Sequence, residues 1–176
     1  MWTPADWAWI GGLFDALFPA WYHGVPVLGH RARKFEPQAA MQLMADHKVR
    51  NVFLPPTALK LMRPIPSPRS RYALKLRVIA SGGEAVGAEI FDWAQRELGI
   101  RINEVYGQTE CNLILANNGS VMPIKPGSMG RPTPGTVTAI IDEQGRAVPP
   151  GVEGQIACRR PHPVMLLEYL NRPDAT

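Results

Sequence analysis

Short β-branched runs alternate with amphipathic segments over the first two thirds of the chain, and this alternation constrains the fold most strongly. Apolar residues recur at helical spacing over residues 12–22, 37–48 and 87–98, and a shorter helix is predicted over 56–62. Runs typical of strands stand between them: VPVLG (25–29), NVFLP (51–55), LRVIASGG (76–83) and IRINEVYG (100–107). Helical crossovers between strands favour an α/β fold, with a partial, mainly parallel sheet flanked by helices.

Two segments refine this prediction. In the first helix, Leu13, Phe14, Leu17, Phe18 and Trp21 fall on one broad apolar face. The Pro- and Arg-rich segment 63–73 is expected to be a surface loop.

The pattern of apolar residues and turns in the sequence changes after about residue 120. From Pro123 onward, short β-rich runs are joined by Gly/Pro turns, and no helical pattern is present. We therefore expect an α/β subdomain over 1–122 and the start of a β-rich, partial barrel-like subdomain over 123–176.

Composition excludes several classes of protein. At 176 residues with 45% hydrophobic and 19% charged residues, the chain can bury a core. The only cysteines, Cys111 and Cys158, argue against a disulfide framework and against a four-ligand structural zinc site. A reducing, cytoplasmic location is expected. The hydrophobic N-terminus carries Asp6 and Asp15 and is interrupted by Gly and Pro, so it predicts neither a signal peptide nor a membrane span.

The positive charge is concentrated in one region. Residues 31–77 hold eleven Lys and Arg and only two acidic residues, within a net charge of +4 for the whole chain. Such a stretch can bind nucleic acid or a phosphorylated cofactor, or it can be a solvated basic face. Few aromatic residues are interleaved with these charges, which disfavours nucleic acid as a partner.

Two loops that follow strands carry the chemistry. Ligands of a parallel sheet bind beyond the carboxyl ends of its strands. Ser81-Gly82-Gly83-Glu84-Ala85 offers bare backbone to a flat base, and Tyr106-Gly107-Gln108-Thr109-Glu110 adds a ring for stacking, a hydroxyl and a carboxylate suited to Mg²⁺. Taken singly, Gly-Gly is often only a turn and Thr-Glu a helix start.

Together these motifs resemble the adenylate-forming superfamily, and most closely its acetyl- and medium-chain acyl-CoA synthetases. The resemblance covers essentially the whole chain. It is carried by ADWAWIGG (5–12), FLPPTALKLM (53–62), ASGGEAV (80–86), NEVYGQTE (103–110), KPGSMGRPTPG (125–135) and QIACRR (155–160).

The resemblance implies an enzyme that joins ATP and a carboxylic acid as an acyl-adenylate, releases pyrophosphate, and transfers the acyl group to coenzyme A. Gly83, Glu84 and Ala85 would line the adenine and Tyr106 would stack on it. The nucleotide loop would comprise Glu104, Val105, Tyr106, Gly107, Gln108 and Thr109. Thr109 would contact the α-phosphate, and Glu110 would bind magnesium.

The resemblance also implies an acyl pocket. Its candidate wall residues are Trp9, Ile10, Gly11, Gly82 and Gly107. Acetate-specific relatives carry a Trp at the position of Gly107, so Gly there favours a longer acid; alternatively, the loop only needs a flexible backbone. For Trp9, core packing is an equally good explanation. The basic stretch 31–77 would then suit the phosphates of coenzyme A.

Three elements expected from the resemblance are absent. They are the Ser/Thr/Gly-rich phosphate loop, the Trp…Thr-Gly-Asp segment and the C-terminal domain with its lysine. The sequence is therefore expected to be an internal piece of a longer enzyme, inactive alone and prone to self-association through exposed apolar surface. The alternative is a free-standing, non-catalytic module that binds nucleotide or acyl-adenylate.

Overall fold

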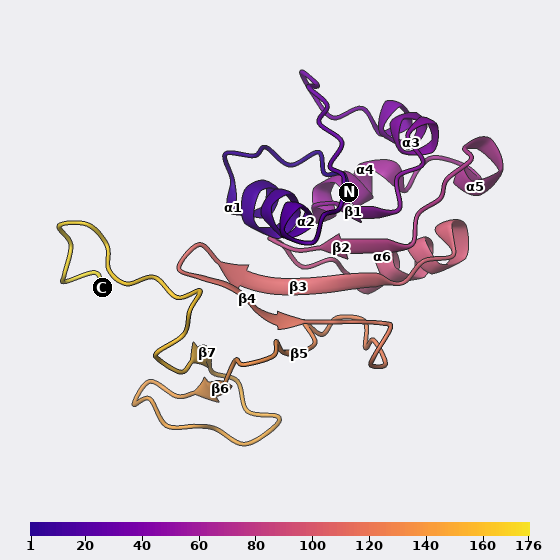
Figure 1. Cartoon of the computed structure of the whole chain (residues 1–176). Coiled ribbons are helices and arrows are strands. Elements are labelled where there is room, and N and C mark those ends of the chain that lie inside the picture. Colours follow the sequence, from indigo (N-terminus) through magenta and orange to yellow (C-terminus); the bar gives the residue numbers. More distant parts are fainter.

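A computed structural model describes all 176 residues as an α/β layer followed by a smaller β hairpin and an extended C-terminal segment (Figure 1). The helices are α1 (Ile10–Gly12), the π-helix η1 (Leu13–Leu17), α2 (Phe18–Tyr22), α3 (Pro37–Asp46), α4 (Pro56–Met62), α5 (Pro68–Arg71), α6 (Ala88–Trp93) and the π-helix η2 (Ala94–Leu98). The strands are β1 (Asn51–Phe53), β2 (Val78–Ser81), β3 (Ile102–Gln108), β4 (Cys111–Ala116), β5 (Arg131–Pro132), β6 (Thr138–Ile141) and β7 (Gln155–Cys158).

The main sheet has the order β1-β2-β3-β4-β5. Its first three strands are parallel, with Phe53 opposite Ala80 and Ser81 opposite Glu104. The connections between these strands carry α4 and α6, which confirms the predicted α/β fold.

The sheet continues beyond β3 in a way that the sequence did not predict. β4 turns back antiparallel to β3, and β5 pairs antiparallel with β4. The strand predicted over 100–107 is found as β3, which continues to Gln108. Residues 106–108 of the expected loop therefore belong to a strand, and Thr109 and Glu110 form the tip of the β3–β4 hairpin.

One large core fills the space between the parallel strands and the helices α3, α4 and α6. Residues on one face of the strands are fully buried there, among them Val52, Ile79 and Ile102. The predicted apolar face of residues 87–98 also points into this core, contributing Ile90, Phe91, Ala94 and Leu98.

The helical stretch of α1, η1 and α2 lies on the opposite face of the sheet, where Phe53 points because side chains alternate along a strand. Its buried residues are Gly12, Ala16, Leu17 and Ala20, and three of these four are small. The aromatic side chains of the predicted apolar face stay exposed, with Phe14 at 53%, Phe18 at 43% and Trp21 at 59%. The helix was predicted correctly, but most of its aromatic face does not enter the core.

The strand predicted over residues 25–29 is wrong. The edge position beside β1 is taken by Trp2, which forms a parallel bridge with Val52. Residues 25–28 lie outside it as irregular chain, held by a bond from Leu28 N–H to the Met1 carbonyl. Pro26 has no N–H to donate, which disfavours a regular ladder in this segment.

The predicted loop over residues 63–73 is wrong in part. It contains the one-turn helix α5, and Ile65, Pro68 and Tyr72 are buried.

β6 and β7 form a separate antiparallel hairpin, with Ile140 opposite Ile156. In Figure 1 this hairpin, drawn in orange, lies away from α3 to α6. The main sheet extends to β5, so the subdomain boundary at residue 123 stays a prediction.

Candidate functional site

The two predicted loops lie side by side because β2 and β3 are neighbouring parallel strands. Gly82 packs directly on β3: a Cβ at this position would lie 2.6 Å from the Val105 carbonyl oxygen. The glycine is therefore required by the close approach of the two strand ends.

The turn after β2 is held from α4. Glu84 accepts a hydrogen bond from the Thr57 hydroxyl at 2.7 Å, and Lys60 lies 3.7 Å from the same carboxylate. Gly83 has a φ of +93°, a conformation that favours glycine, although a Cβ at this position would meet no atom within 4 Å. Gly83, Glu84 and Ala85 are all exposed to solvent.

The side chain of Glu104, on β3, contacts the loop that follows β2. Its Oε1 accepts a hydrogen bond from the Val86 N–H at 3.1 Å, while Oε2 is buried without a partner. The residue is only 5% exposed. Because a buried carboxylate needs hydrogen bonds, Glu104 stabilises the turn beyond β2 and is not itself open to a ligand.

Tyr106 is half-buried on β3, opposite Leu115 of β4. Its hydroxyl lies 3.4 Å from the side-chain amide of Gln108. Tyr106 and Glu104 are two residues apart on one strand, so they project from the same face of the sheet.

Gly107 stands at an irregularity in the β3–β4 pairing between Tyr106 and Gln108. A Cβ on Gly107 would collide with the backbone nitrogen of Leu113 and would come within 3.0 Å of the Cys111 carbonyl oxygen. The absence of a side chain is thus explained by the packing of β4, and gives no support to a longer acyl pocket.

Thr109 is exposed at the hairpin tip, and Glu110 is half-buried beside it. The Tyr169 hydroxyl donates to Glu110 Oε1 at 2.7 Å, and Leu166 N–H donates to the Glu110 carbonyl at 2.7 Å. The Tyr169 hydrogen bond, followed by a backbone contribution, lowers the pKa of Glu110, and the same contact raises the pKa of Tyr169. Glu110 is therefore ionised at neutral pH, with Oε2 left for another ligand.

The helix that carries the first motif contacts the hairpin through Asp15, which the sequence did not indicate as a site residue. Asp15 accepts a hydrogen bond from the Asn112 side-chain amide at 2.8 Å. Burial raises the pKa of Asp15, and this hydrogen bond opposes the rise. The contact joins the helix of the first motif to β4.

The candidate acyl-wall residues of this motif differ in their surroundings. Gly11 lies against the Phe53 ring, which a Cβ at this position would approach to 3.2 Å. Ile10 is half-buried, whereas Trp9 is 72% exposed and packs into no core.

A cavity of about 310 Å³ opens beside the hairpin. Its lining includes Tyr106, Gln108 and Glu110 of the predicted residues, together with Arg160 and Tyr169. Gly83 and Ala85 are not part of it. Tyr169 and Asn112 were missed, because nothing local in the sequence marks either as a partner of Glu110 or Asp15; Thr57 lay inside a quoted motif.

A larger cavity of about 1060 Å³ lies near Trp2, beside the β1 edge of the sheet. It is lined by the N-terminal residues and by part of the basic stretch, including Arg31, Arg33 and Lys34. None of the predicted nucleotide residues lines it.

The parallel strands, the glycine turn and the antiparallel hairpin define an α/β protein with two adjoining loops beyond its strands, and comparison with known proteins identifies the family. The model of the AMP-binding enzyme family matches residues 1–170, so the chain belongs to this family. It is 32% identical to the acyl-coenzyme A synthetase ACSM3 (mitochondrial) of Mus musculus, over 100% of this chain and 30% of that protein. It is also 32% identical to the acyl-coenzyme A synthetase ACSM4 (mitochondrial) of Homo sapiens, with the same coverage.

Solved structures agree. A benzoate CoA ligase from Burkholderia xenovorans superposes with a TM-score of 0.88 at 25% identity, over 99% of this chain and 35% of that one. An acyl-CoA synthetase of Brucella canis gives a TM-score of 0.82 at 31% identity, over 89% of this chain and 29% of that one. The chain thus spans about 30% of the length of the curated relatives it matches.

None of the helices has both the length and the apolar composition needed to span a membrane.

Proposed function

We propose that this chain supplies the adenine and acyl walls of an AMP-forming acyl-CoA synthetase, an acid–thiol ligase. The whole reaction would join a carboxylic acid to AMP, release pyrophosphate, and pass the acyl group to the thiol of coenzyme A. The observation that carries this proposal is the junction of the two loops, where Gly82 packs on Val105 and Val86 N–H binds Glu104. Membership of the AMP-binding enzyme family supports the choice of nucleotide.

The adenine would lie over the glycine turn. Gly83 and Ala85 are exposed there, and Tyr106 projects from the neighbouring strand. Bare backbone can read the edge of a base and an aromatic ring can stack on its face. Glu84 would be positioned by Thr57 and Lys60.

The phosphates would lie at the hairpin tip. Thr109 is exposed and its hydroxyl can donate to a phosphate oxygen, while Glu110 keeps one free carboxylate oxygen beside the 310 Å³ cavity. A single carboxylate together with phosphate oxygens and water fits Mg²⁺. Glu110 would hold this ion, which would neutralise charge on the phosphates.

The carboxylic acid would approach from the first motif. Trp9, Ile10 and Gly11 are the proposed wall residues, with Gly82 and Gly107 at the strand ends. The contact between Asp15 and Asn112 supports this, because it fixes the helix of the first motif against the hairpin. The basic lining of the larger cavity, with Arg31, Arg33 and Lys34, suits the phosphates of coenzyme A.

Binding of MgATP and of a non-hydrolysable acyl-adenylate analogue tests the proposal, measured by calorimetry on the 176-residue chain. We expect the analogue to bind, and Glu110→Gln to weaken MgATP by about tenfold while AMP binding stays unchanged, because AMP lacks the phosphates that bind the metal with Glu110. Glu143→Gln, at an exposed turn, is the matched control. Failure of wild-type chain to bind any adenine nucleotide would refute the proposal.

The alternative is a binding module that does not catalyse. It differs in one measurement, ATP–pyrophosphate exchange in a longer polypeptide that contains this chain. Exchange dependent on a carboxylic acid supports the ligase, whereas analogue binding without exchange supports the module.

We also infer a reducing compartment, because a chain with only two cysteines offers no disulfide framework. The cytoplasm is the proposed location, although the relatives named above are mitochondrial proteins. Subcellular fractionation of the native protein distinguishes the two.

A further inference from the structure

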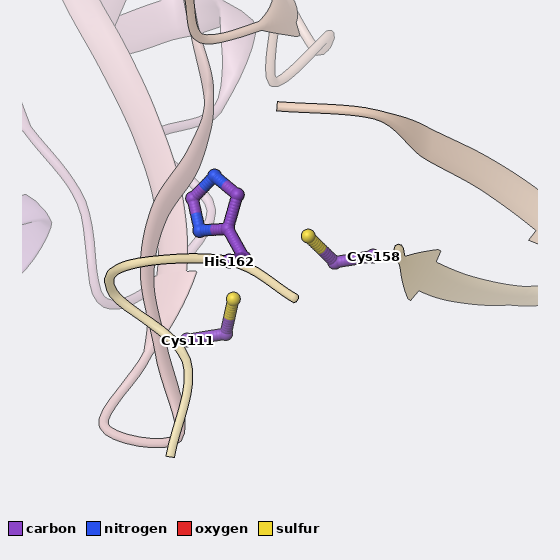
Figure 2. A group of neighbouring side chains, drawn as sticks. All are labelled: Cys111, Cys158 and His162. Atoms are coloured by element: carbon purple, nitrogen blue, oxygen red, sulfur yellow. The ribbon is translucent and has the colours of Figure 1, made fainter. Parts of the chain in front are cut away.

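Two cysteines and a histidine converge where the main sheet meets the second hairpin (Figure 2). Cys111 begins β4, Cys158 ends β7, and His162 lies in the irregular segment that follows β7. One potential ligand atom from each lies within 4.8 Å of the other two. All three side chains are partly buried.

A series of hydrogen bonds determines which nitrogen of the neutral His162 ring carries the proton. Its Nε2 lies 3.0 Å from the Thr136 hydroxyl, which lies 2.8 Å from the Thr133 hydroxyl, which donates to the Leu113 carbonyl at 2.9 Å. Because the carbonyl can only accept, each hydroxyl proton points toward it, and Nε2 must donate the first proton. Neutral His162 therefore carries its lone pair on Nδ1.

This lone pair has no partner in the fold. Nδ1 of His162 is buried and makes no hydrogen bond. A buried acceptor without a hydrogen-bond partner costs free energy, and a ligand that binds this atom would remove that cost. Metal-binding histidines typically donate their second ring N–H to a fixed acceptor, which is the role that Thr136 fills here.

We propose that Cys111, Cys158 and His162 form a binding site for one Zn²⁺ ion. Two sulfurs and one imidazole nitrogen are a donor set typical of zinc and unsuited to Mg²⁺ or Ca²⁺. Tetrahedral zinc needs donor atoms about 3.5–3.8 Å apart, given its bond lengths. Donors that already lie within 4.8 Å reach this geometry by a movement of about 1 Å, available through the single χ1 rotation of each cysteine.

Two cysteines alone supply half of the four ligands of a zinc site, which is why the sequence argued against one. The fold adds His162 as the third ligand, and water completes the coordination. Binding replaces the two thiol protons, which are released to solvent. The ion would join β4 to β7, and thereby the main sheet to the second hairpin.

The site is tested on the ligand-free chain, purified under reducing conditions and treated with chelator, so the result does not depend on nucleotide binding. We expect one Zn²⁺ per chain by competition with a chromophoric chelator. Co²⁺ in its place should show thiolate charge-transfer absorption and the intense visible bands of tetrahedral coordination. At a hundredfold excess of free Zn²⁺ over its dissociation constant, the melting temperature should rise by roughly 5–10 °C.

Cys111→Ser, Cys158→Ser and His162→Gln should each abolish stoichiometric uptake. His47→Gln, at an exposed position beyond α3, is the matched control and should bind as wild type. Thr136→Val should keep one site per chain but weaken it by about 10–100-fold, because it removes the acceptor that orients His162.

Two results would overturn the proposal. One is a wild-type Co²⁺ spectrum without thiolate absorption, a measurement that does not depend on any variant folding. The other is a Cys111–Cys158 disulfide in mass spectra of protein purified without oxidant, because it would remove both thiolate ligands.

Discussion

The hydroxyl of Tyr169 donates to the carboxylate of Glu110 at 2.7 Å, across 59 residues of sequence. The acidic residue proposed to hold magnesium is therefore already engaged by one oxygen in the ligand-free chain. A nucleotide-bound metal would use the other oxygen or displace the tyrosine.

Removing this hydroxyl should change the titration of Glu110. Tyr169→Phe should raise the pKa of Glu110, because the hydrogen bond from Tyr169 is the first cause of its lowering. A lowered acid pKa contributes stability that is present above the unfolded pKa, about 4.3, and is lost as pH falls through the folded pKa. The variant should therefore lose less stability on acidification than wild type. NMR titration of the Glu110 carboxyl measures the shift; Tyr22→Phe, with no hydrogen bond to Glu110, should leave it in place.

Asp15 should show the opposite pH dependence. Burial raises its pKa, so its charge costs stability at pH values above both the unfolded and the folded pKa, and this cost disappears at lower pH. Asp15→Asn keeps an acceptor for Asn112 and removes the charge. Compared with wild type at pH 7, it should melt about 2–4 °C higher, which corresponds to about 1 kcal/mol, and this advantage should vanish near pH 3. A variant less stable than wild type at pH 7 would contradict the prediction; exposed Asp92→Asn is the control.

Gly107→Ala tests whether the glycine at position 107 is required by the packing of β4 or by the shape of the acyl pocket. Because the added methyl would collide with the backbone of β4 at Leu113, we expect a loss of about 1–3 kcal/mol in the free energy of unfolding. Gly29→Ala, whose Cβ would meet only the Trp7 ring at 3.4 Å, should cost much less. Urea denaturation measures both. Equal stability of the two variants would show that the packing of β4 does not require a glycine at position 107.

The exposed aromatic residues of the first helix predict concentration-dependent self-association. The Phe14 and Phe18 rings lie 5.3 Å apart edge to face, and Trp21 continues the surface. Phe18→Glu should shift sedimentation profiles toward monomer, whereas Leu167→Glu, in the C-terminal segment, should not. Monomeric wild-type protein across the accessible concentration range would refute the prediction.

Local pattern was sufficient for much of the fold. Helical spacing located residues 56–62 and 87–98, and the strands at Asn51–Phe53 and Val78–Ser81 followed from short apolar runs bounded by Gly, Pro and Arg. The order of these elements then implied neighbouring parallel strands, which is why Gly82 and Val105 meet. All of this depends on residues close together in sequence.

Tertiary structure decided the remainder. The apolar run 111–116 became β4 only because the edge of β3 was free to pair with it, and VPVLG stayed irregular because Trp2 occupies the edge beside β1. The partners of Glu110, Asp15 and His162 are likewise distant in sequence. Periodicity states which side chains share a face, but which polar groups meet across separate elements depends on how the whole chain packs.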